Sequence, residues 1–168
     1  MGTPQIQPNL KETYLAVIGN AVGSRMFRNF YLTVDGKVVD AIRDGVVACA
    51  FFASNILHMF VAPRWISEPH LTVKSTVKDM KAHGWYVITE PRIGAVIIWG
   101  PDKSAESKLI HGTLSESHIG FYTGHGKAIS NYYKTGIIEE HHWTFGTNAD
   151  DSPVRDVREI LWHDALGK

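Results

Sequence analysis

The order of the elements predicts an α+β fold, in which N-terminal helices pack on a mostly antiparallel sheet. Residues 10–83 carry apolar side chains mainly at helical spacings of three and four. Residues 85–145 instead hold short runs rich in Val, Ile and aromatic residues. Pro91 and Gly94 separate the first two of these runs. Strands that follow helices, rather than alternating with them, are typical of α+β proteins.

The N-terminal part of the chain is expected to contain a loose, Pro-containing lead and then two helices. The lead covers residues 1–9, and the helices share residues 10–32, where two glycines interrupt the pattern. Ser24 is a suitable N-cap for the second of these helices. Residues 33–39 place Asp-Gly between apolar residues, which predicts a hairpin turn.

Two further helices are expected before the strands begin. The first starts near Cys49, directly after an Asp-Gly turn, and runs to about residue 60. The second spans residues 72–83, where the leading Thr is a suitable N-cap and the following Gly fits the position that ends a helix.

The C-terminal half is expected to supply the sheet. Residues 100–116 are polar and predict a loop, and the charged residues 147–168 predict a C-terminal extension with a short helix near residues 154–162. The strands are expected at residues 85–88, 95–99, 118–123, 127–133 and 137–145.

Composition restricts the class of protein. The chain has 168 residues, enough for one domain with a real core, and 17 basic residues balance 17 acidic ones. A net charge of zero argues against nucleic acid as the main partner. The N-terminus lacks the features of a signal peptide, and no apolar run is long enough to span a bilayer. We therefore expect a cytoplasmic protein, or one released without a signal peptide.

The single cysteine is the first candidate for chemistry. Cys49 has no partner for an internal disulfide, and it stands where a helix is expected to begin. Unpaired N–H groups and the helix dipole stabilise a thiolate at that position, and the thiolate is the nucleophilic form. The alternative interpretation is that Cys49 is a small buried residue that only fills space.

A histidine at the start of a later strand is the second candidate. Alternation places His118 and Gly120 on one face of residues 118–123, and the Gly-His-Gly turn folds the next strand back beside them. Ser130 or Asn131 would then reach the imidazole and fix its tautomer and orientation. The alternative is a histidine on a strand edge without a catalytic role.

Taken together, these motifs resemble the NlpC-type and CHAP domains of the papain-like superfamily. The resemblance covers residues 46–131: Cys49 at a helix start, Pro-Arg-Ile-Gly before an apolar strand at residues 91–99, and His-Ile-Gly-Phe-Tyr-Thr-Gly-His-Gly at residues 118–126. It implies a papain-like α+β fold, with the cysteine helix packed on the sheet. It also implies a cysteine peptidase or amidase that needs no cofactor.

The resemblance implies a role for each matched residue. Cys49 would be the nucleophile and His118 the general base of a thioester mechanism. Ser130 occupies the position of the family's third polar residue, but we prefer Asn131 because an amide orients imidazole better than a hydroxyl. The substrate class implied is a peptide or amide bond of bacterial peptidoglycan. The protein itself would come from a bacterial host or from a phage. Ala48 departs from the family, which often has a polar residue there.

Two other functions compete with this interpretation. His111, His118 and His125 recur at steps of seven and His141 adjoins another histidine, so a His-rich zinc-binding protein is an alternative. No His-x-x-x-His or Cys-x-x-Cys pair supports it. The other alternative is an inactive papain-like relative that binds wall fragments or a protein partner.

Overall fold

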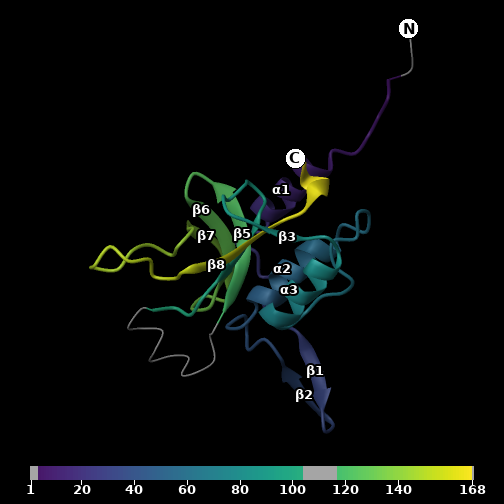
Figure 1. Ribbon diagram of the computed structural model, residues 1–168. Coiled ribbons are helices and arrows are strands. Elements are labelled where there is room, and N and C mark those ends of the chain that lie inside the picture. Colours follow the sequence, from purple (N-terminus) through teal and green to yellow (C-terminus); the bar gives the residue numbers. More distant parts are fainter. Residues whose placement is uncertain (1–3, 104–116, 168) are drawn as a thin grey trace.

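The computed structural model describes residues 4–103 and 117–167 and has an α+β architecture, as the sequence predicts. Figure 1 shows the helices on one side of the main sheet. Helices α1 and α2 pack on that sheet, and α3 packs on α2. Their bounds are α1 Leu10–Asn20, α2 Cys49–His58 and α3 Val73–Ala82.

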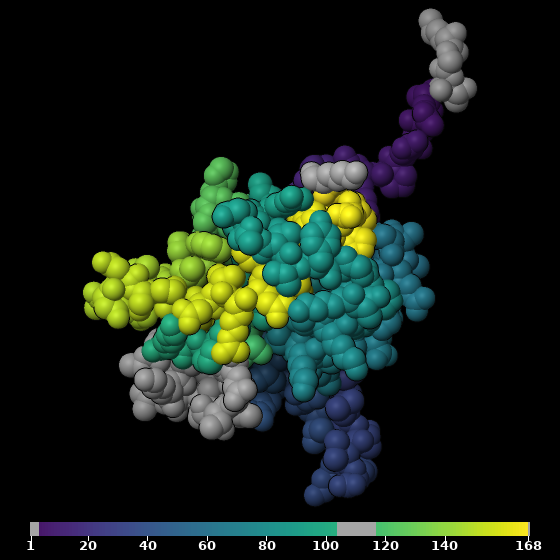
Figure 2. Space-filling model, viewed as in Figure 1, coloured from purple at the N-terminus to yellow at the C-terminus, as the bar shows by residue number. Residues whose placement is uncertain are grey.

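Within the described residues, six strands form the main sheet, in the order β3-β8-β4-β5-β6-β7, and every neighbouring pair is antiparallel. Two further strands form a separate hairpin, which extends from the body of the molecule in Figure 2. The bounds are β1 Tyr31–Val34, β2 Lys37–Asp40, β3 Tyr86–Ile88, β4 Val96–Trp99, β5 His118–Gly124, β6 Lys127–Tyr132, β7 Ile137–His142 and β8 Val157–Trp162.

The predicted second helix within residues 10–32 is wrong. Residues 21–28 form turns and bends after α1, and the chain then enters strand β1. The apolar residues that suggested a helical face instead anchor this turn on α2. The Phe27 ring lies 5.1 Å from the Phe52 ring, and the Phe30 ring lies 5.1 Å from the Phe51 ring.

The predicted helix near residues 154–162 is also wrong, and residues 147–168 are more than an extension. Strand β8 lies inside the sheet between β3 and β4. Ile160, Leu161 and Trp162 are all buried, and Leu161 pairs with Val96 of β4. A run of apolar residues that is buried on both faces suits a central strand better than a surface helix.

The sheet is covered on both faces where β4 and β5 run side by side. Between the sheet and the helices, the Tyr14 ring packs edge-on against Trp65 and Phe121 at 4.9 and 5.9 Å. On the opposite face a smaller apolar cluster surrounds Ile97 and Trp99. The ends of β4 and β5 therefore lie in a region shielded from water.

No helix among the described residues is long and apolar enough to cross a membrane.

Candidate active site

Cys49 is the first residue of α2, as the sequence predicts. The N-cap residue Ala48 supplies no side-chain hydrogen bond, so no side-chain acceptor competes for the first N–H groups of the helix. Burial raises the pKa of the Cys49 thiol. The backbone N–H groups of Ile119 and Ala50, together with the Arg155 charge, oppose that effect but do not cancel it. The resting group is thus a neutral thiol rather than the thiolate expected from the helix N-terminus.

The turn that leads into Cys49 is fixed to the strands of the sheet. Asn131 Nδ2 donates to the carbonyl oxygen of Gly45 at 2.7 Å. Gly45 also lies against Gly136, where an added Cβ would meet the Gly136 Cα at 2.5 Å. Both residues have positive φ, so glycine is required there for conformation as well as for space. These contacts set the position of the thiol from β6 and from the turn after it.

His118 begins β5 and lies in the small apolar cluster of the opposite face. Its ring is 5.5 Å from the Trp99 ring, and its Nε2 is 2.9 Å from Ser130 Oγ. Gly120, opposite Ser130 in the register, makes this approach feasible. A Cβ on Gly120 would lie 2.7 Å from the Ser130 Cβ.

The preference for Asn131 as the partner of His118 is therefore corrected. Ser130 and Asn131 are neighbours on β6, and they point to opposite faces of the sheet. No register shift occurs there to bring both to one face. Ser130 contacts the imidazole, whereas Asn131 holds the turn before Cys49 from the helix side.

The thiol of Cys49 lies beside the backbone at the start of β5, next to the residue that carries the imidazole. The N–H group that faces the thiol belongs to Ile119, the residue directly after His118. No hydrogen bond joins Cys49 to His118 within the described part of the chain, although Arg155 acts electrostatically on both. Burial, with a smaller contribution from Arg155, places the pKa of His118 well below its usual range. Both groups are therefore neutral at rest.

A second histidine lies behind Ser130, and sequence reasoning missed its position. His141 Nε2 is 2.7 Å from Ser130 Oγ, and its Nδ1 is 2.7 Å from the carbonyl oxygen of His142. The His141 ring stacks on Phe145, with the ring centroids 3.9 Å apart. Burial lowers the pKa of His141 to about 4. The only sequence signal was the pair of adjacent histidines on a half-polar strand.

Arg155 was also missed, because it lies in the segment interpreted as an extension. Its side chain is only 4% exposed, and its Nη1 donates to the Gly100 carbonyl oxygen at 2.9 Å. The guanidinium lies 5.3 Å from the centre of the Phe145 ring and 3.6 Å from the carboxylate of Asp102. A buried positive charge at this point favours a negative charge on the sulfur of Cys49.

The zinc interpretation gains no support from the described residues. No group of three or more His, Cys, Asp and Glu side chains that could hold a metal ion occurs in residues 4–103 and 117–167. His125 lies in the turn after β5, at the opposite end of that strand from His118. His111 lies outside the described residues.

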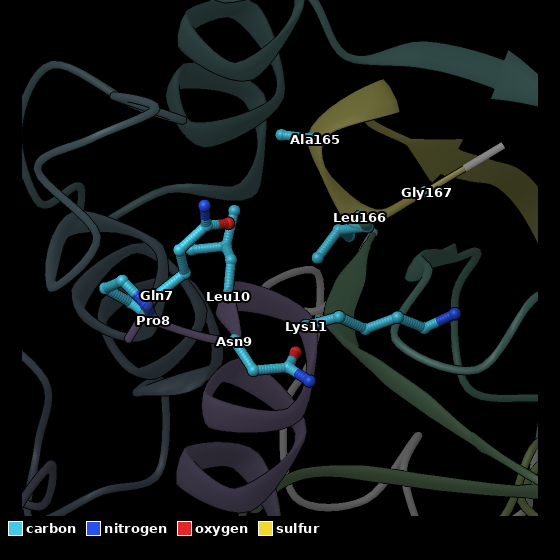
Figure 3. A pocket seen from close by; sticks show the side chains of 8 residues that line it. All are labelled: Gln7, Pro8, Asn9, Leu10, Lys11, Ala165, Leu166 and Gly167. Atoms are coloured by element: carbon cyan, nitrogen blue, oxygen red, sulfur yellow. The ribbon is translucent and has the colours of Figure 1, made fainter. Parts of the chain in front are cut away.

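One open pocket lies apart from these groups. Figure 3 shows it between the N-terminal lead with the start of α1 and the short helix η1, Asp164–Leu166. None of Cys49, His118 and Ser130 lines it. Its lining residues are Gln7, Pro8, Asn9, Leu10, Lys11, Ala165, Leu166 and Gly167.

Comparison with known proteins finds no family. No protein-family model matches the chain, and no curated protein matches it in sequence at a significant level. The chemistry of the site therefore rests on its own geometry and on the motifs of the sequence.

Proposed function

We propose that this protein is a papain-like cysteine peptidase or amidase of the NlpC or CHAP type. The observation that carries the proposal is that the Cys49 thiol lies beside the residue that follows His118, whose ring contacts Ser130. The Cys49 thiol lies at a helix N-terminus against the N–H of Ile119, and the Nε2 of the preceding residue, His118, lies 2.9 Å from the Ser130 hydroxyl oxygen. A nucleophile, a base and a group that orients the base are the parts that such a reaction needs.

The reaction would start from a neutral pair. Because burial raises the pKa of the Cys49 thiol and lowers that of His118, the proton would move only as the sulfur attacks. The Cys49 S–H proton passes to His118 while a bond forms between sulfur and the carbonyl carbon of the substrate. His118 then returns the proton to the amide nitrogen as the C–N bond breaks. Water subsequently hydrolyses the thioester, which releases the acid and restores the thiol.

Two features of the site would stabilise the charge that develops. The backbone N–H of Cys49, at the start of α2, is suited to donate to the oxyanion. The Arg155 guanidinium favours negative charge on sulfur in a region with little water. From the motif resemblance we propose that the substrates are peptides of bacterial peptidoglycan, and that this protein is a bacterial or phage enzyme. The proposed reaction uses no cofactor.

The test is hydrolysis of purified peptidoglycan and its stem peptides, with the new amines and acids identified by mass spectrometry. We expect Cys49→Ala and His118→Ala to lower the rate by about 10⁴-fold or more, because the nucleophile and base act as one unit. His125→Ala is the matched control, because this histidine lies in the turn after the far end of β5, and it should retain the wild-type rate.

Two results would contradict the proposal. Undiminished hydrolysis by a folded Cys49→Ala variant would remove the nucleophile. A wild-type protein that binds wall fragments without cleaving any of them would support the inactive relative instead.

A further inference from the structure

We propose that His141 is a positioning residue which, through the Ser130 hydroxyl, determines which ring nitrogen of His118 carries the proton. The tautomer assignment follows from the contacts alone, whereas its role in catalysis rests on the proposed function. Its evidence is the chain of contacts from β5 across β6 to β7, His118–Ser130–His141.

The direction of the hydrogen bonds can be derived from the outer end of this chain. His141 Nδ1 is 2.7 Å from the carbonyl oxygen of His142, and a carbonyl oxygen only accepts. His141 Nδ1 must therefore carry a hydrogen. A neutral imidazole has one N–H, so His141 Nε2 holds a lone pair and acts as an acceptor. The lowered pKa of His141 is consistent with a neutral ring at neutral pH.

The Ser130 hydroxyl then has only one possible orientation. It has a single proton, and at 2.7 Å it must donate that proton to His141 Nε2, because that nitrogen cannot donate. Toward His118 the oxygen of Ser130 can only accept. His118 Nε2, at 2.9 Å, is consequently the N–H donor, and the lone pair of the neutral His118 lies on Nδ1.

This assignment gives His118 the tautomer that a base requires. Nδ1 is the ring nitrogen not engaged by Ser130, and it is therefore the one left to take the thiol proton of Cys49. A serine alone would not select this tautomer, since a hydroxyl can donate to Nε2 as readily as it accepts from it. His141 removes that ambiguity by taking the only proton of Ser130.

The surroundings of His141 hold its ring in the required orientation. The Phe145 ring stacks on the His141 ring, with the centroids 3.9 Å apart. The Arg155 guanidinium lies over the Phe145 ring, 5.3 Å from its centroid. The charged and titratable groups that act on His141 are Arg155, His142 and Glu140. Burial is the largest effect and disfavours a protonated His141, as do the charges of Arg155 and His142, whereas the hydrogen bond to the His142 carbonyl oxygen and the charge of Glu140 favour it.

The experiment is NMR of isotope-labelled histidine, which distinguishes protonated from unprotonated ring nitrogens, combined with kcat and KM. In the wild type we expect His118 protonated at Nε2. His141→Phe keeps a ring to stack on Phe145 but removes the acceptor. We expect mixed tautomers of His118 in this variant and a kcat at least about tenfold lower, with KM unchanged, because a wrong tautomer cannot take the proton.

Two variants complete the test. His141→Gln retains an acceptor oxygen and should restore both the tautomer and much of kcat, which a purely structural role would not predict. His58→Phe, a substitution of an exposed histidine at the last position of α2, should leave both readouts unchanged. If His141→Phe does not fold, Ser130→Ala breaks the same chain and should give the same mixture of tautomers.

The outcomes separate the two proposals. An unchanged Nε2-protonated His118 in folded His141→Phe and Ser130→Ala would overturn the role of His141, whatever the activity. A shifted tautomer in a protein that hydrolyses none of the peptides tested would support the role of His141 and count against the proposed enzyme.

Discussion

Two hairpins in this molecule have the same turn but opposite surroundings. β1 and β2 are joined by Asp35 and Gly36, with φ values of 50° and 77°, and β5 and β6 by His125 and Gly126, with 51° and 71°. Two central residues with positive φ characterise the tight turn that matches the twist of antiparallel strands. All four residues of β1 are exposed, whereas the first four residues of β5 are buried.

The difference shows what a turn determines and what it leaves to packing. The turn brings two strands together, but an isolated two-stranded hairpin is marginally stable in water. β5 and β6 have partners on both sides within the main sheet and carry the candidate site. Among the residues that the structure describes, β1 and β2 pair only with each other, and they are held mainly at their base, where Phe30 packs on Phe51.

The largest expected difference between the hairpins concerns their aromatic side chains. Phe121 of β5 is fully buried against Tyr14 and Phe52, so Phe121→Ala should lower the free energy of unfolding by about 3–5 kcal/mol. Tyr31 of β1 is 63% exposed, and Tyr31→Ala should change it by less than about 0.5 kcal/mol. Urea denaturation measures both. Equal losses would mean that the two hairpins are equally integrated in the fold.

The second difference is in the pH range over which each region loses stability. The folded-state pKa values of His118 and His141 lie below the unfolded value, so the unfolded chain binds more protons as the pH falls from about 6.5 toward 4. Stability should therefore decrease in that range, by about 1.4 kcal/mol per pH unit for each group over the interval where its protonation differs. His141→Gln should flatten this decrease in thermal denaturation followed by circular dichroism.

The base of the β1–β2 hairpin should respond only in stronger acid. Burial raises the pKa of Asp40, but hydrogen bonds from the backbone of Phe30, Asp44 and Ile42 and from Asn29 outweigh it and bring the pKa to about 2. Its contribution is present above the unfolded value and is lost as the pH falls toward 2. Asp40→Asn should thus differ from the wild type at pH 7, with the gap closing below about pH 4. A gap that closes already near pH 6 would contradict the assignment.

The smallest expected effects come from the turns themselves. Gly126→Ala and Gly36→Ala each place a side chain at positive φ, which costs about 1–2 kcal/mol. Within β5–β6 this cost should appear in global unfolding. Within β1–β2 we expect faster amide hydrogen exchange confined to the hairpin, because this element can open without the core. A full global loss in Gly36→Ala would show that the hairpin unfolds together with the sheet.

Local signals in the sequence were sufficient for much of this fold. The side chain of Thr72 caps α3 by accepting from the Ser75 N–H, and α2 begins at Cys49, both as predicted. Both tight turns were also predicted, because Asp-Gly and Gly-His-Gly need backbone conformations that few residues adopt. These features depend on residues within a few positions of one another.

The errors and omissions involve contacts between distant segments. Strand β8 owes its place to pairing with β3 and β4, and no pattern within residues 157–162 indicates those partners. The sequence offered both Ser130 and Asn131 as partners of His118. Choosing Ser130 requires knowing which face of β6 each side chain occupies, and only the folded sheet shows this. His141 and Arg155 reach the site from β7 and from the segment before β8, so only the assembled sheet reveals them.

The contact between Gly45 and Gly136 also has a consequence for the order in which the chain folds. These residues are far apart in sequence, and closing such a long loop is among the slower steps of folding. The turn before Cys49 cannot take its final place until Asn131 and Gly136 are present to receive it. During synthesis, helix α2 leaves the ribosome long before its thiol is held in position, so the Cys49 thiol is set in place only after the chain has been made as far as Gly136.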